Sequence, residues 1–204
     1  RHLRTLGINI NTSPVLDLHQ TKTHKIIGNR SYSDNPITVN KLGQACIKFY
    51  KNNKIGTVIK HIPGHGKAKA DSHLKLPVVK ENLSILEKND FHCFKKTKSL
   101  FAMTAHILYN KIDKNYNATH SKNLIKKIIR KKIGFKGILI SDDISMKALK
   151  YNVVKNAKLA LEAGCNILLY CGGKTHEVKK ILKETPYIDS HTKKKTSEFY
   201  KFLS

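Results

Sequence analysis

Apolar segments alternate with helical segments five times along this chain, and that alternation limits its fold more than any other feature. The predicted strands lie at residues 8–18, 56–62, 100–106, 137–140 and 165–171, and the predicted helices at 39–52, 81–96, 121–132, 153–163, 177–183 and 196–203. The strands are apolar throughout, which is typical of parallel strands buried on both faces. The sequence therefore predicts an α/β protein built on a parallel sheet.

Two architectures fit this pattern. A barrel of eight strand-helix units needs about 250 residues, and the chain has 204. An open, doubly wound sheet is the direct alternative. No GxGxxG or GxxxxGK[ST] phosphate loop follows a predicted strand, which weakens a nucleotide-binding version of that sheet. The length suits a single domain over residues 1–204.

The formal charge of +25 raises the question of a nucleic-acid partner. Only four of the 39 basic residues are arginines, whereas phosphate and base recognition both favour the arginine fork. The lysines are spread along the whole chain, so a solvated lysine surface is favoured over a specific nucleic-acid interface. No apolar run approaches the roughly 20 residues that cross a bilayer, and no apolar signal core follows the N-terminal residues. We expect neither a membrane nor a specific nucleic acid as partner.

The cysteine pattern indicates free thiols. Cys46, Cys93, Cys165 and Cys171 form no CxxC pair, and each lies in an apolar or helical segment. Buried free thiols are therefore favoured over disulfides or a metal site. We expect no cofactor.

Polar side chains follow nearly every predicted strand. They are Asp17, the pair Lys60 and His61, His106, and the pair Asp142 and Asp143. Because the carboxyl ends of parallel strands meet at one edge of a sheet, these residues are predicted to line one pocket despite their separation in sequence.

A carboxylate at the end of the fourth predicted strand is a candidate nucleophile. With a strand period of two, Asp142 falls in line with Ile138 and Ile140, at the mouth of an apolar strand. A carboxylate restrained in this way suits a nucleophile or an electrostatic stabiliser. A helix-capping or salt-bridged aspartate is an equally good interpretation of position alone.

The loop after the second strand supplies a candidate acid/base pair. Asp71 and His73 are two residues apart, so in an extended loop their side chains share a face. A carboxylate that accepts a hydrogen bond from one imidazole nitrogen fixes the tautomer and prepares the ring for general acid/base catalysis. Taken alone, this pair is a weak signal.

Metal binding is the alternative for the same stretch, since His61, His65, Asp71 and His73 all carry possible ligands. The spacing of the first two histidines suits zinc on a helix, and the intervening Pro63–Gly64 excludes a helix. We therefore predict no metal site and treat His65 as a residue that structures the loop.

Together these residues give the chain a close resemblance to the bacterial β-N-acetylhexosaminidases of glycoside hydrolase family 3, over about residues 2–175. The matching segments are 6–9, 14–17, 27–32 with Asp34 and Pro36, 60–66, 71–73, 103–106, 134–137, 141–146 and 163–165. The stretch Lys60–His73, with its lysine-histidine-x-proline-glycine-histidine-glycine and aspartate-serine-histidine motifs, is the most specific of them.

The resemblance implies a retaining glycosidase that removes terminal, non-reducing β-linked N-acetylglucosamine from peptidoglycan fragments in the cytoplasm. It assigns Asp142 as the nucleophile, and His73 as the acid/base, oriented by Asp71. It assigns the substrate-binding residues as Arg30, Lys60 and His61. A histidine then replaces the second carboxylate of the usual glycosidase pair. The implied partner is a small carbohydrate, and we expect a monomer.

The resemblance also implies a (β/α)8 TIM-barrel type of fold, here as an incomplete barrel that lacks the first two strand-helix units. The family's second strand ends in an acidic, glycine-rich segment whose aspartate binds the sugar, and that segment is absent from this sequence. Asn29, Ser33 and Asn166 also depart from the common family residues. The chain is therefore interpreted either as a fragment of a longer enzyme or as a relative that binds sugar without turnover.

Overall fold

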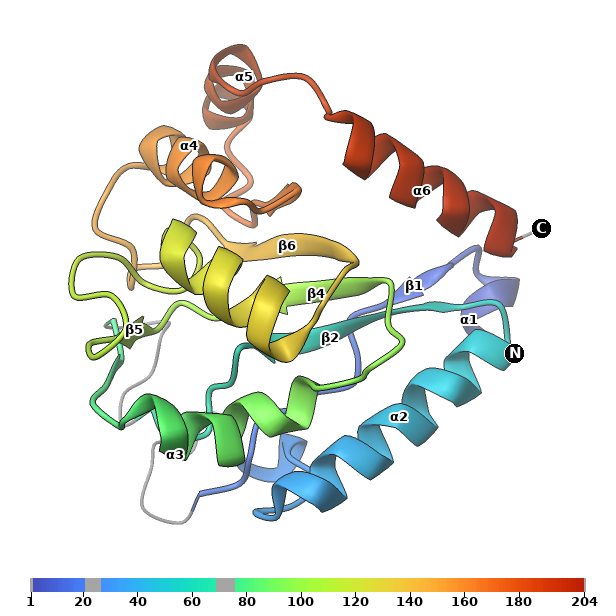
Figure 1. Cartoon of the computed structure of the whole chain (residues 1–204). Helices are drawn as coiled ribbons and strands as arrows, with labels where there is room; N and C mark the ends of the chain where they lie inside the picture. The colour runs from blue at the N-terminus through green and yellow to red at the C-terminus, as the bar shows by residue number, and fades with distance from the viewer. Residues whose placement is uncertain (1, 21–26, 69–75, 204) are drawn as a thin grey trace.

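The computed structural model describes residues 2–20, 27–68 and 76–203, and its centre is a parallel sheet of five strands. The strands are β1 (Ile10–Asn11), β2 (Gly56–Ile62), β4 (Phe101–Thr104), β6 (Ile138–Asp143) and β7 (Ile167–Leu169). Their order in the sheet follows their order in the chain (Figure 1). In a doubly wound sheet the order of the strands reverses at a switch point. The order observed here has no such reversal and is that of part of a barrel. The predicted α/β class and partial barrel are confirmed.

Helices connect the strands, as the alternating pattern predicts. They are α1 (His2–Thr5), η1 (Gly28–Arg30), α2 (Pro36–Asn52), α3 (Leu83–Lys88), η2 (Asp90–Phe94), η3 (Leu124–Ile133), α4 (Val153–Ala163), α5 (Thr175–Glu184) and α6 (Ser190–Leu203). Local chemistry sets several ends. The Asn35 side chain accepts from the first N–H groups of α2, and Pro36 occupies its first turn. At the start of η3 the Leu124 N–H donates to Ser121 Oγ, and Gly134 ends the helix with a positive φ of 80°.

The predicted helix at 81–96 is wrong as a single element. The chain breaks at Asn89, whose φ and ψ are −112° and −95°, and continues as the short 3-10 helix η2. In a 3-10 helix residues three apart lie on the same side, which turns Phe91 and Phe94 together into the core. Both are almost fully buried.

The first predicted strand, 8–18, is also wrong in length. Only Ile10–Asn11 pairs as β1, and contact with β2 resumes at Val15, which bridges to Lys60. Pro14 lies between the two paired stretches and has no N–H to donate to a neighbouring strand. A short second sheet, β3 (Val78–Val79) with β5 (Leu108–Tyr109), was not predicted.

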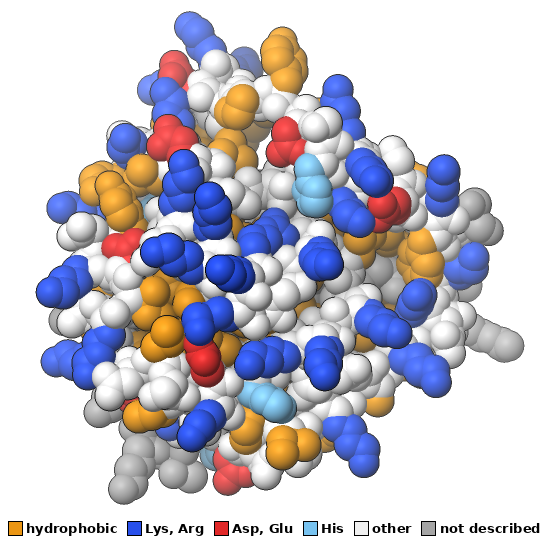
Figure 2. All heavy atoms as spheres, in the orientation of Figure 1, with side chains coloured by type: hydrophobic (Ala, Val, Ile, Leu, Met, Phe, Trp, Pro, Cys, Tyr) orange, Lys and Arg blue, Asp and Glu red, His pale blue; other side chains and the backbone are white. Residues whose placement is uncertain are grey.

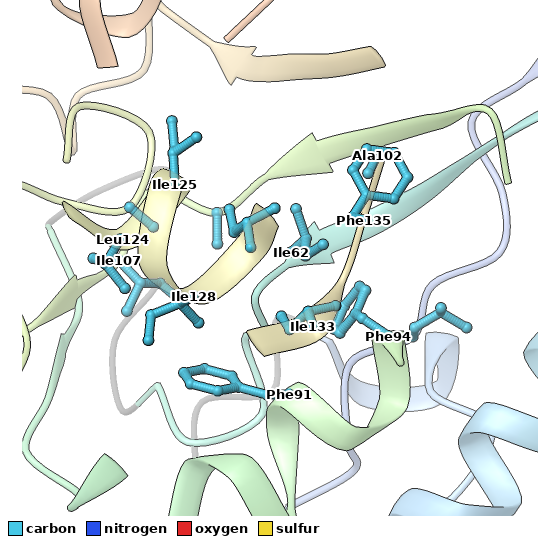
Figure 3. Packing of buried hydrophobic residues seen from close by; sticks show 14 of the residues in the cluster. Ile62, Phe91, Phe94, Ala102, Ile107, Leu124, Ile125, Ile128, Ile133 and Phe135 are labelled. Atoms are coloured by element: carbon cyan, nitrogen blue, oxygen red, sulfur yellow. The ribbon is translucent and has the colours of Figure 1, made fainter. Parts of the chain in front are cut away.

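The main hydrophobic core fills the space between the sheet and the helices that follow its strands. Figure 3 shows Phe91 and Phe94 of η2 facing Ile128 and Ile133 of η3, with Ile62 of β2 nearby. Because alternate strand residues point to opposite faces, a second cluster forms on the other face of the sheet. Its centre is Val58, Phe101 and Ile138, covered by Phe199 of α6.

The basic side chains are distributed rather than gathered. On the face shown in Figure 2, lysine and arginine side chains are scattered over the surface, with acidic and apolar groups between them. Among the described residues, no helix combines the length and apolar character needed to cross a membrane.

Candidate active site

Register brings the carboxyl ends of three strands together. Lys60 of β2 pairs with Met103 of β4, and Met103 pairs with Ile140 of β6. The residues that follow these pairs, among them His61 and Asp142, therefore lie at the same edge of the sheet. This is the edge at which parallel α/β folds build their sites.

At this edge, β2 and β6 each carry one extra residue that interrupts their pairing with the next strand. In segment 60–62, β2 advances by two residues while β4 advances by one. In segment 140–143, β6 advances by three residues while β7 advances by two. Such bulges re-aim side chains and are common beside active sites. His61 and Asp142 lie inside the two bulged segments, and the Lys60–His61 peptide bond is cis.

Asp142 is held within β6 rather than beyond it. The predicted strand ended at Ile140, but β6 continues to Asp143, and the bulge interrupts the period of two on which the predicted alignment relied. The Asp142 backbone N–H donates to Thr104 Oγ1 at 3.3 Å, and its Oδ1 accepts from the Asp143 N–H at 2.8 Å. The half-buried carboxylate is thus restrained at the edge of the sheet.

Lys60 lies among charged neighbours. Its pKa is lowered, first by burial and then by the nearby Arg30 guanidinium, while the Asp142 and Asp17 carboxylates act in the opposite direction. Charges influence a titration in this way only when they are close in space. Arg30, at the end of η1, and Asp142 therefore each lie within electrostatic reach of Lys60.

His61 is bound to a buried carboxylate that the sequence did not assign. Its Nδ1 lies 2.7 Å from Asp17 Oδ2, and its backbone N–H is 3.2 Å from both oxygens of Asp17. The Asp17 side chain is wholly buried, whereas the His61 side chain is 12% exposed. The His61 ring is therefore partly exposed, while its Nδ1 contacts the buried Asp17 carboxylate.

His65 belongs to the structure of the loop. Its side chain is buried, and its backbone N–H donates to Asp17 Oδ1 at 2.8 Å. In the described part of the chain, no group of three or more histidine, cysteine, aspartate or glutamate side chains is arranged to hold a metal ion.

The side chains of His106 and Asp143 form hydrogen bonds that connect the ends of neighbouring strands. His106 is fully buried, which lowers its pKa. Its Nε2 lies 2.9 Å from the Asp143 carbonyl oxygen, so Nε2 carries the proton, and Nδ1 lies 2.8 Å from Thr119 Oγ1. The Asp143 carboxylate accepts from Ser145 and from the Cys171 backbone N–H. Contrary to the expectation from sequence, the fully buried His106 supports the strand ends and does not line a pocket.

Four of the six predicted site residues are therefore placed at one edge of the sheet: Arg30, Lys60, His61 and Asp142. The predicted acid/base pair, Asp71 and His73, lies outside the described residues. The residue that sequence reasoning underused is Asp17. Its place after an apolar, proline-containing segment marks it as a strand-end group. Its hydrogen bonds to His61 and His65 depend on the pairing of Val15 and Leu16 with Lys60 of β2, which the sequence does not show.

Comparison with known proteins identifies the family. Residues 1–195 match the family model described as the glycosyl hydrolase family 3 N terminal domain. The chain belongs to glycoside hydrolase family 3. The curated Beta-hexosaminidase of Neisseria meningitidis (serogroup C, strain FAM18) is 37% identical over 174 residues, covering 83% of this chain and 48% of that protein. The Beta-hexosaminidase of Methylobacillus flagellatus is 33% identical over 174 residues, covering 83% and 49%.

Solved family 3 structures share the fold. NagZ from Neisseria gonorrhoeae, in complex with N-trifluoroacetyl-D-glucosamine, aligns with a TM-score of 0.85 and 31% identity, covering 100% of this chain and 58% of that one. A family 3 β-N-acetylglucosaminidase from Paenibacillus sp. aligns with a TM-score of 0.86 and 27% identity, covering 98% and 40%. The chain thus spans about half the length of the curated relatives it matches.

Proposed function

We propose that this family 3 chain provides the catalytic centre of a retaining glycosidase that removes terminal, non-reducing β-linked N-acetylglucosamine. The observation that carries the proposal is the restrained Asp142 carboxylate at the end of β6, beside the cationic Lys60 and Arg30. Cations beside a nucleophilic carboxylate suit the binding of a sugar rich in hydroxyl and carbonyl oxygens, because both side chains offer only donors.

The proposed first step is attack of the Asp142 carboxylate on the anomeric carbon. The bond from that carbon to the leaving oxygen breaks while His73 gives its proton to that oxygen, and a covalent glycosyl-aspartate forms. In the second step a water molecule gives its proton to His73 and its oxygen to the anomeric carbon, which frees Asp142. Asp71 would orient the imidazole throughout.

The proposed substrate is an N-acetylglucosaminyl fragment of peptidoglycan, and the proposed location is the cytoplasm. Support for the sugar comes from relatives that bear the name Beta-hexosaminidase, and from a related NagZ that was solved with an N-acylated glucosamine. Arg30, Lys60 and His61 would bind the sugar hydroxyls and the N-acyl group from the same edge of the sheet.

An aryl N-acetyl-β-glucosaminide tests the assignment of Asp142. Wild type is expected to release the aryl alcohol with retention of the anomeric configuration, and Asp142→Ala to lower kcat by at least about a thousandfold, as expected when a nucleophile is lost. Glu162→Gln, which removes an exposed carboxylate on α4 away from the site, is the matched control and should leave the rate unchanged. Equal rates for Asp142→Ala and wild type would rule out the nucleophile.

A second candidate function is sugar binding without turnover. It is motivated by Asn29 and Ser33, which depart from the residues common in the family. Calorimetry with N-acetylglucosamine separates the two: heat of binding without any aryl release would favour a sugar-binding protein, and release of the aryl alcohol would exclude it.

A further inference from the structure

Asp17 is an almost completely buried carboxylate at this edge of the sheet. Its residue is 1% exposed, and three donors from two parts of the chain converge on it. Two belong to His61, whose ring Nδ1 and backbone N–H both point at the carboxylate, and the third is the backbone N–H of His65. The backbone of Asp17 is itself fixed, because its carbonyl accepts from Ser31 Oγ at 2.7 Å.

This set of partners favours an ionised carboxylate. Burial by itself would raise the pKa of Asp17, but attraction to His61, the hydrogen bonds from His61 and attraction to His65 together bring the pKa below its usual value. An ionised carboxylate only accepts hydrogen bonds. The ring nitrogen at 2.7 Å must therefore be the donor, which places a proton on His61 Nδ1.

We propose that Asp17 is a positioning residue of this site: it holds His61 as the Nδ1–H tautomer, so that Nε2 is left to accept from a sugar hydroxyl. The role in sugar binding depends on the proposed glycosidase function, whereas the tautomer follows from the 2.7 Å contact between His61 Nδ1 and the buried, ionised Asp17 carboxylate. A buried acceptor that fixes the tautomer and orientation of a functional histidine is a recurrent device in metal and catalytic sites.

The same carboxylate also joins two parts of the site. His61 belongs to β2, whereas His65 lies in the segment that leaves β2 toward Asp71 and His73. A purely structural anchor would need only the two backbone donors. The additional short contact to the His61 ring indicates a positioning role, because it constrains a side chain that reaches the surface.

Nitrogen NMR of the histidine rings tests the tautomer without any substrate. At a pH at which the ring is neutral, wild-type His61 is expected to show a protonated Nδ1 and an unprotonated Nε2, with the signals assigned by their loss in His61→Gln. Asp17→Asn keeps the shape of the side chain but replaces one acceptor by an NH2 donor. It should give a mixture of tautomers or the Nε2–H form. If wild type carries its proton on Nε2, or Asp17→Asn leaves the spectrum unchanged, the proposal is wrong.

Tyr109→Phe is the matched control for a general loosening of this region. The Tyr109 hydroxyl donates to the Gly64 carbonyl, so this variant removes an anchor of the same segment without touching Asp17. Its His61 tautomer should remain that of wild type. Loss of the tautomer in both variants would show that local packing, rather than Asp17, selects it.

Kinetics on the aryl substrate then test the consequence for binding. Asp17→Asn is expected to lower kcat/KM by roughly tenfold or more, the size of effect seen when the partner that orients a histidine is removed, and mainly through KM. A changed tautomer with unchanged KM would overturn the role in sugar binding. If wild type is inactive, the glycosidase proposal fails, while the NMR experiment still decides the tautomer.

Discussion

Asp90 is a second buried carboxylate near this edge, and its surroundings are the opposite of those of Asp17. It is 1% exposed, and neither side-chain oxygen has a hydrogen-bond partner among the described residues. The chain at Gly64 and Gly66 lies directly against it, since a Cβ on Gly64 would come within 2.6 Å of the Asp90 Cβ. Burial raises the pKa of Asp90 to about 6, although the Lys67 ammonium lowers it in part.

Replacing Asp90 should therefore stabilise the protein in a manner that depends on pH. The folded state binds the proton of Asp90 more tightly than the unfolded state, whose pKa is near 3.8. The free energy of unfolding then falls as pH rises from about 4 to about 6, by on the order of 2 to 3 kcal/mol. Asn cannot ionise, so Asp90→Asn should be the more stable protein at pH 8 and nearly equal to wild type at pH 4.

Urea unfolding of Asp90→Asn and wild type at both pH values measures this difference. A stability gain of the same size at pH 4 and pH 8 would show that ionisation of Asp90 is not its source. If Asp90→Asn is less stable than wild type at pH 8, the inference that the buried Asp90 carboxylate destabilises the folded protein is wrong.

At the scale of the element, the strands could be predicted from sequence and the details at their ends could not. Continuous apolar runs identified β2, β4, β6 and β7 because burial on both faces leaves a clear signal. A bulge leaves none, since it depends on which residue of the neighbouring strand is opposite. His61 and Asp142 were therefore predicted as site residues from motif and position, while their bulged backbone was not.

The close approach of β4 and β6 gives a prediction for one glycine. A Cβ on Gly137 would lie 2.2 Å from the Leu100 carbonyl oxygen, a backbone atom that cannot move aside without shifting the strand. Gly137→Ala should therefore destabilise the protein by about 3 kcal/mol, at the upper end of overpacking effects. Thermal or urea unfolding measures the change.

Gly134→Ala is the control for that variant. Gly134 ends η3 with a φ of 80°, and no atom lies within 4 Å of the added Cβ. Its cost should be limited to the strained backbone, about 1 kcal/mol. If the two variants are equally stable, contact between the strand backbones does not limit the packing of the sheet.

At the scale of the whole molecule, α6 has a role that its sequence only partly indicated. The predicted helix at 196–203 was the last part of the observed Ser190–Leu203, and nothing in its composition showed which surface it covers. The structure places its apolar side against the face of the sheet that is remote from η2 and η3 (Figure 1). Contacts between residues so distant in sequence follow from topology rather than from local pattern.

Phe199 is the residue through which α6 closes that face. It is 5% exposed, and its ring packs edge-on against Phe101 of β4 with centroids 5.1 Å apart. A Cβ on Gly56 of β2 would come within 2.7 Å of the same ring, so the helix contacts two strands at once. Covering this apolar face is therefore expected to contribute substantially to the stability of the whole sheet.

Phe199→Ala should lower the free energy of unfolding by about 3 to 5 kcal/mol, the range for removing a buried phenylalanine. Tyr200→Ala is the matched control, because the neighbouring Tyr200 is 70% exposed and its loss should cost well under 1 kcal/mol. Urea unfolding followed by circular dichroism compares the two. If the sheet is held together mainly by the helices on its other face, the two variants will unfold at similar urea concentrations. A large difference would instead mean that α6 is part of the cooperative core.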